Sequence, residues 1–155
     1  MHHSLVTSEM QILANIETLG GSPTFAVVAA SNVAQGAAAL AVFYLFKKDV
    51  KMKAIALAAG ISALLGITEP AVFGVNLKLK YPFVAALIGS AVGAAYATWR
   101  EVLSVSQGPA GLPGVIVIRP QSMVQYMVAL GIAFVVTFVV TILFAKMSQA
   151  KSKLH

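Results

Sequence analysis

A single acidic side chain, Glu69, lies inside an apolar stretch that runs from Ala54 to Val75. A carboxylate at the centre of a bilayer costs about 2.5–3.5 kcal/mol on insertion scales, so an acid at that depth first suggests a functional site. An ionised carboxylate accepts hydrogen bonds on both oxygens, and each such bond contributes about 1.5–3 kcal/mol. We therefore expect Glu69 to accept hydrogen bonds from the hydroxyl groups of a polar solute. The alternative is that Glu69 ends a helix and reaches the water interface.

Pro70 directly follows Glu69 and constrains the backbone at this point. Proline lacks the N–H that a continuous helix needs, and it disfavours the α region for the residue before it. Irregular backbone at membrane depth is tolerated where protein surrounds it or where it lines a cavity. We therefore predict that Glu69 lies outside regular helix, at a helix break beside a binding cavity.

Four other polar side chains could contribute to a site. Asn32 and Gln35 lie three residues apart, on one face of a predicted helix. They could line the cavity, or they could tie helices together, which is a common use of amides in membranes. His2 and His3 stand at the N-terminus, and from the residues alone a frayed, solvated terminus is the favoured interpretation. The pair lacks the acidic or cysteine neighbours of a metal site, so the sequence predicts neither a metal nor a cofactor.

The composition is that of a membrane protein. Of the 155 residues, 59% are hydrophobic and 10% are charged, whereas an average soluble domain carries about 25% charged residues. A core of this size cannot hide so much apolar surface, so lipid must cover much of it. The net charge of +6 comes from short basic clusters beside apolar runs, a pattern of membrane topology rather than of nucleic-acid binding. The absence of cysteine excludes disulfides and cysteine nucleophiles within the chain.

Three apolar runs have the roughly 20 residues that a helix needs to cross a bilayer. They are Thr24–Phe46, Pro82–Trp99 and Ser122–Ala145. A fourth run, Ala54–Ile67, would extend only about 21 Å as a helix, which falls short of a hydrocarbon layer of ~30 Å. The region from 107 to 120 is rich in Gly and Pro and contains a strand-like run, Val115–Ile118.

The lysines decide how the short run is arranged. If it crossed the membrane, the cluster at 47–53 and the pair Lys78 and Lys80 would lie on opposite sides. If it enters and returns as a hairpin, both groups and the C-terminal lysines all face the cytoplasm, and only Arg100 and Arg119 face outward. The second arrangement satisfies the positive-inside tendency far better. We therefore predict a re-entrant hairpin with Glu69 near its turn, and a cytoplasmic C-terminus.

The predicted fold is thus an all-α membrane protein with about three transmembrane helices and a re-entrant hairpin. Gly89 and Gly93, four residues apart in the second span, predict a close approach to another helix. Tyr81 and Trp99 bracket the same span, which is typical of anchors at the membrane interface.

Longer strings of residues stand in a distinctive order along the chain. They are Met1-His2-His3-Ser4, Asn32-Val33-Ala34-Gln35-Gly36-Ala37-Ala38 and Leu65-Gly66-Ile67-Thr68-Glu69-Pro70-Ala71-Val72-Phe73-Gly74-Val75-Asn76, the last continuing through Phe83. In this order they resemble the membrane-embedded IIC component of bacterial phosphotransferase-system sugar permeases. The closest likeness is to the sucrose-type permeases of the glucose–glucoside superfamily, and it fades after about Arg119.

The resemblance implies roles for the candidate residues. A IIC protein has an oligomerisation part followed by a transport part, whose re-entrant hairpins hold the sugar. In that family the glutamate of the Gly-Ile-Thr-Glu-Pro motif and a histidine of the His-His motif hydrogen-bond the sugar. Those residues correspond here to Glu69 and to His2 or His3, since a neutral imidazole can donate and accept at once. Thr68, Asn32 and Gln35 are carried over as neighbours of the site, and no catalytic residue is expected.

The resemblance also implies partners and a location. The expected ligand is sucrose or a related glucoside, and the phosphate would come from IIB and IIA domains on other chains or in missing segments. The intact family forms homodimers in the bacterial inner membrane and belongs to the phosphohistidine–sugar phosphotransferases. Because this chain has no phosphate-donating cysteine domain, its own enzymatic activity is left open.

The chain begins inside the His-His motif, which suggests the C-terminal part of a permease. We therefore expect an N-terminal amphipathic or hairpin remnant at 1–23, a partial IIC transport domain at 24–145 and a basic cytoplasmic tail at 146–155. The leading hypothesis is a permease segment for sugar uptake. The alternatives are a truncated, non-transporting membrane interaction or scaffold protein, and a gene product without a stable fold.

Overall fold

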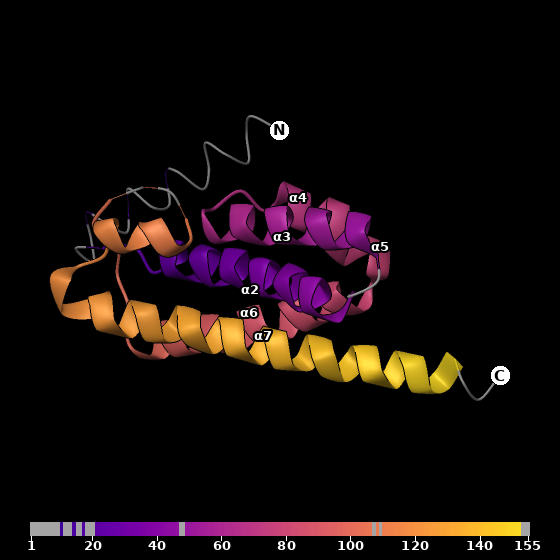
Figure 1. Ribbon diagram of the computed structural model, residues 1–155. Helices are drawn as coiled ribbons and strands as arrows, with labels where there is room; N and C mark the ends of the chain where they lie inside the picture. Colours follow the sequence, from indigo (N-terminus) through magenta and orange to yellow (C-terminus); the bar gives the residue numbers. More distant parts are fainter. Residues whose placement is uncertain are drawn as a thin grey trace.

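The computed structural model describes residues 10, 14, 17, 21–46, 49–106, 108 and 110–152. Within these ranges the protein is almost entirely helical (Figure 1). In chain order the elements are α2 (Thr24–Leu45), α3 (Val50–Leu64), α4 (Glu69–Ala71), the π-helix η1 (Val72–Asn76), α5 (Leu77–Leu79), α6 (Tyr81–Trp99), the 3-10 helices η2 (Leu112–Val117) and η3 (Pro120–Ser122), and α7 (Met123–Ser152). The predicted all-α membrane fold is confirmed, because the three predicted spans correspond to helices long and apolar enough to cross a bilayer.

Helix α2 is the central helix of the bundle. In Figure 1 it runs between the α3–α4 pair and the α6–α7 pair. In the most apolar part of α2, 72% of the positions are buried inside the protein, against 33% in the span of α6 and 28% in the span of α7. Small residues allow this burial, since a Cβ on Gly36 of α2 would lie only 3.0 Å from the carbonyl oxygen of Gly60 in α3. Helices α6 and α7 consequently present most of their surface outward.

Helices α6 and α7 pack against each other at the predicted glycine pair. A Cβ on Gly93 would lie 2.6 Å from the Cβ of Ala133, and one on Gly89 would collide with the hydroxyl of Thr137. Small residues spaced by four let two helix backbones approach closely, which dispersion and packing reward in a membrane. The prediction of a close helix contact at this motif is confirmed.

The segment from Val50 to Leu79 forms the predicted hairpin. Helix α3 runs along α2, the chain reverses between Leu65 and Thr68, and α4, η1 and α5 return beside α3 (Figure 1). Helix α3 has 15 residues, or about 22 Å at 1.5 Å per residue. The turn therefore comes before a hydrocarbon layer of ~30 Å would be crossed.

The two ends of the bundle carry different basic residues. In Figure 1 the start of α3, the junction of α5 with α6 and the C-terminal part of α7 lie at one end. We call this the lysine end, because these segments contain Lys51, Lys53, Lys78, Lys80 and Lys146. The opposite end holds the last turn of α6 and the start of α7, and we call it the arginine end after Arg100 and Arg119.

The sequence predicted a strand-like run at Val115–Ile118, but the structure shows mostly 3-10 helix there. Pro113 sits at the start of η2, where its fixed φ suits a tight helical turn. The Gly114 N–H then closes that turn by donating to the Gly111 carbonyl oxygen at 3.1 Å. Only Ile118 is extended, and it forms an isolated antiparallel bridge with Ser104, which also pairs with Ser22.

Two predicted boundaries shift. Helix α3 begins at Val50 rather than at Ala54, because the side chain of Asp49 accepts a hydrogen bond from the Met52 N–H at 2.9 Å and caps the helix. Asp is a favoured N-cap residue, since its carboxylate satisfies one of the free N–H groups of the first turn. Helix α7 continues past the predicted end at Ala145 to Ser152. Most of the predicted segment 1–23 lies outside the described residues.

Candidate functional site

The hairpin turn is built on Gly66. Its φ is +101°, in the left-handed region that glycine enters without a steric penalty. The N–H groups of the turn find acceptors in the last turn of α3. Gly66 donates to the Ala63 carbonyl oxygen and Ile67 donates to the Ser62 carbonyl oxygen, each at 3.0 Å. A Cβ on Gly66 would also collide with the carbonyl oxygen of Ala110. The turn therefore needs glycine both for its backbone conformation and for the close approach of the loop that follows α6.

Glu69 is the first residue of the returning arm of the hairpin. Helix α4 begins at Glu69, with Pro70 in its first turn, where the missing N–H of proline would have no helical partner in any case. The prediction that Glu69 lies outside regular helix is therefore wrong. The break falls just before it, at Leu65–Thr68, and Pro70 starts a helix instead of ending one. Glu69 does lie beside the hairpin turn, as predicted.

The carboxylate of Glu69 is exposed. It makes no hydrogen bond or ion pair with any residue that the structure describes. The neighbouring Thr68 is half-buried, and its carbonyl oxygen accepts from the Val72 N–H at 2.9 Å. The described residues thus do not enclose Glu69 in the predicted cavity, and its two oxygens are available to hydroxyl donors from outside this part of the chain.

Asn32 anchors the loop that covers the hairpin turn. Its Nδ2 donates to the Ala110 carbonyl oxygen at 3.3 Å, the same oxygen that Gly66 approaches. The next residue is held by Tyr126 of α7, whose Oη donates to the Gly111 carbonyl oxygen at 2.6 Å. The loop is therefore tied to α2 and to α7 while it packs on the turn. The sequence left cavity lining and a tie between helices open for Asn32. The observed contact joins α2 to a loop close to the turn beside Glu69.

Gln35 ties α2 directly to the returning arm. The Nδ2 group of the fully buried Asn76 lies 2.7 Å from the Gln35 Oε1 and 3.1 Å from the Gln35 carbonyl oxygen, and it donates to both. Gln35 is itself 7% exposed, and its Oε1 faces the returning arm of the hairpin. Among the two roles left open by the sequence, the structure shows the interhelical one for Gln35.

Asn76 ends a π-helical segment, η1. Such segments are rare and frequently lie at functional sites. The Oδ1 of Asn76 is buried and has no hydrogen-bond partner among the described residues, although a buried acceptor left unpaired costs about 1–3 kcal/mol. The returning arm therefore combines an irregular backbone with an unsatisfied polar atom at its attachment to α2.

Sequence reasoning gave no role to Asn76 or Tyr126. Asn76 carried a usable signal, because an amide at the end of an apolar run follows the same logic as Asn32 and Gln35. Tyr126 carried none, since its partner is a backbone carbonyl in an irregular loop. His2 and His3 lie outside the described residues. In the part of the chain that the structure describes, no three His, Asp or Glu side chains gather to hold a metal ion.

Comparison with known proteins finds a family that matches the chain. Residues 1–90 match the family described as "Phosphotransferase system, EIIC". The sucrose-specific EIIBC component of Staphylococcus xylosus is 52% identical over 122 residues, covering 79% of this chain and 25% of that protein. The sucrose-specific EIIBC component of Vibrio alginolyticus is 50% identical over 97% of this chain and 31% of that protein.

A trehalose-specific relative is more distant. The trehalose-specific EIIBC component of Bacillus subtilis is 39% identical over 94% of this chain and 30% of that protein. The chain thus spans between about a quarter and a third of the length of these curated relatives. No solved structure matches the chain.

Proposed function

Because this chain belongs to the EIIC family of the phosphotransferase system, we propose that it is a membrane permease segment of a sucrose-class sugar transporter. It binds sugar for uptake, and a separate IIB domain phosphorylates the sugar. The sucrose-specific names of relatives that match nearly the whole chain support this assignment. Sucrose or a related glucoside is the proposed ligand.

The observation that carries the proposal is the position of Glu69. It is an exposed carboxylate at the start of a helix, beside the turn of an apolar hairpin, and it has no partner among the described residues. Sugar hydroxyls are hydrogen-bond donors, and a carboxylate can accept from two of them, with about 1.5–3 kcal/mol for each charged bond. Thr68 and a histidine, His2 or His3, complete the proposed contact set. Asn32 and Gln35 support the hairpin and its covering loop.

The proposed orientation places the lysine end in the cytoplasm. All the lysines of the described chain lie in segments at that end of the bundle, and an excess of Lys and Arg marks cytoplasmic loops. The C-terminus is then cytoplasmic, in a multi-pass protein of the bacterial inner membrane. IIB and IIA domains approach from the same side; a relative named as an EIIBCA component supports this partnership. Assembly as a homodimer is part of the proposal.

Sugar uptake tests the site. We expect Glu69→Gln, placed in an intact sucrose transporter that carries this segment, to abolish sucrose uptake while the protein still inserts at normal levels. The matched control is Glu17→Gln, which removes the same charge at another exposed position and leaves uptake unchanged. Normal uptake by the Glu69→Gln transporter would refute the site.

Direct binding of sugars to the purified chain tests which sugar is the ligand. Radiolabelled sucrose should bind the purified chain saturably, with competition by unlabelled sucrose stronger than by trehalose. Preferred competition by trehalose would keep the site and change the sugar. Saturable binding that persists undiminished in Glu69→Gln would instead remove Glu69 from the site.

A further inference from the structure

The last turn of α6 ends in an unusual way. The Glu101 N–H donates to the Thr98 carbonyl oxygen at 3.1 Å, and the Val102 N–H donates to that of Ala97 at 3.0 Å. This pair of bonds is the Schellman motif, which places a left-handed residue just past the helix and usually fills that position with glycine. Here the position holds Glu101, whose φ is +50°.

Glutamate is a poor choice for this position on two independent grounds. A side chain in the left-handed region brings Cβ against the following carbonyl, a clash that glycine avoids. A negative charge at a helix C-terminus also meets the negative end of the helix dipole, which favours cations there. Residues held in such a conformation gather at ligand-binding sites, so the Glu101 side chain is a candidate for a binding role.

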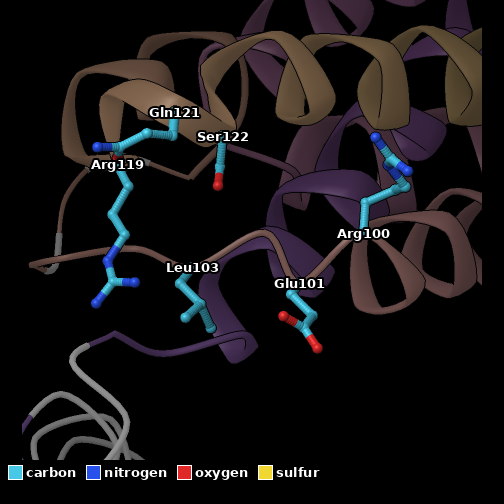
Figure 2. A pocket seen from close by; sticks show the side chains of 6 residues that line it. All are labelled: Arg100, Glu101, Leu103, Arg119, Gln121 and Ser122. Carbon is cyan, nitrogen blue, oxygen red and sulfur yellow. The ribbon is translucent and has the colours of Figure 1, made fainter.

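Glu101 borders a pocket of about 490 Å³ at the arginine end. Figure 2 shows the recess between two segments. The chain after α6 carries Arg100, Glu101 and Leu103, and the segment of η3 and its N-cap carries Arg119, Gln121 and Ser122. The Glu101 carboxylate accepts no hydrogen bond and forms no ion pair within the described ranges. The Arg100 guanidinium lies 6.0 Å from the centre of the Trp99 ring. The pocket thus offers the Arg100 guanidinium and the adjacent Glu101 carboxylate to one ligand.

The pocket lies at the depth of lipid headgroups. Trp99 is the last residue of α6 and is 76% exposed, and the apolar stretch of the α7 span begins at Pro120. An exposed Trp at the end of an apolar span is typical of the boundary between hydrocarbon and headgroups. A ligand of the pocket therefore meets it from the membrane surface.

We infer that this pocket binds the headgroup of a zwitterionic aminophospholipid, phosphatidylethanolamine. The Arg100 guanidinium hydrogen-bonds the lipid phosphate, which suits its forked donors, and Glu101 accepts hydrogen bonds from the primary ammonium group. Phosphatidylcholine has no N–H to donate, and phosphatidylglycerol offers the Glu101 carboxylate only neutral hydroxyl donors and no ammonium charge. The preference for an amine-bearing headgroup therefore rests on Glu101.

Lipid retention by the full chain tests the assignment. The chain is purified in detergent and titrated with phosphatidylethanolamine, phosphatidylcholine and phosphatidylglycerol, and the bound lipid is measured by native mass spectrometry. One charged hydrogen bond corresponds to about a tenfold preference, so we expect phosphatidylethanolamine to be retained about tenfold over phosphatidylcholine. Parallel titrations with soluble phosphoethanolamine and with inorganic phosphate test whether binding requires the lipid. If either compound binds as well as phosphatidylethanolamine, the lipid assignment is overturned.

Two variants of Glu101 separate ligand binding from folding. Glu101→Gln removes the charge and should abolish the preference, whereas the control Glu17→Gln should keep it. Glu101→Gly relieves the left-handed strain, so it should raise the thermal unfolding temperature while it too loses the preference. A Glu101→Gly chain that keeps the preference would overturn the proposal, and so would equal retention of all three lipids by the unmodified chain.

Discussion

Two helix contacts hold this bundle together by different means. Helices α6 and α7 meet through Gly89 and Gly93, where the fit to the facing helix leaves no room even for a methyl group. The hairpin meets α2 partly through small residues and partly through the amides of Gln35 and Asn76. Steric fit defines one arrangement, because packed cores are not continuously deformable. The hairpin contact therefore depends on a hydrogen-bonded amide pair as well as on steric fit.

The largest expected effect is at the close-packed contact. Gly89→Ala places a Cβ against the Thr137 hydroxyl and 2.9 Å from the Ala133 carbonyl oxygen, so α6 and α7 must separate. Overpacking of this kind costs about 1–3 kcal/mol, and we expect that loss of unfolding free energy in detergent. Gly131→Ala on α7 is the matched control, because no atom lies within 4 Å of its added Cβ. Equal destabilisation by both substitutions would contradict the comparison.

The amide contact should give an intermediate effect. Asn76→Ala removes the two hydrogen bonds to Gln35 and leaves the buried Gln35 Oε1 without that donor. Interhelical hydrogen bonds in membranes contribute about 0.6–1.7 kcal/mol, and we expect a loss of that size in the free energy of unfolding. The coupling can be measured in a double-mutant cycle with Gln35→Ala. Strictly additive losses would show that the two amides do not stabilise each other.

The covering loop should give a smaller effect. Tyr126→Phe removes only the hydroxyl that donates to the Gly111 carbonyl oxygen, and a hydrogen bond of this kind contributes about 0.5–1.5 kcal/mol. We expect the loop at 108–111 to become more sensitive to limited proteolysis, while the α6–α7 contact is unaffected. Unchanged cleavage would mean that the other contacts of the loop, among them the Asn32 hydrogen bond, hold it without Tyr126.

The smallest effect on stability should come from Glu69→Gln. Its side chain is exposed and has no partner among the described residues, and surface substitutions of this type change the free energy of unfolding by less than about 0.5 kcal/mol. The same substitution is expected to abolish sugar uptake. A loss of more than about 1 kcal/mol in thermal or chemical unfolding would instead assign Glu69 a structural role.

Much of the fold could be predicted from the sequence because bilayer thickness and charge limit it. The spans followed from apolar length, and the hairpin followed from lysines on both sides of a run too short to cross. The spacing of Gly89 and Gly93 was enough to predict their close helix contact. Pro70 misled the prediction, because proline starting a helix and proline breaking one look the same in sequence.

The site was less predictable because its supports join distant residues. Asn32 reaches a carbonyl 78 positions later in the chain, and no local pattern specifies which carbonyl that is. The role of Gln35 could be narrowed only once Asn76 was seen opposite it. The 3-10 helix at Leu112–Val117 escaped prediction because β-branched residues in a short run also suit a strand.

The order of synthesis gives the loop over Gly66 one more consequence. A chain emerges from the ribosome N-terminus first, so Gly66 and both arms of the hairpin exist before Ala110 is made, and Tyr126, which holds that loop, comes later still. A nascent chain that ends before Ala110 therefore carries a turn without its covering carbonyl. A chain that ends between Ala110 and Tyr126 has that carbonyl and its Asn32 hydrogen bond, and lacks only the second anchor that α7 supplies.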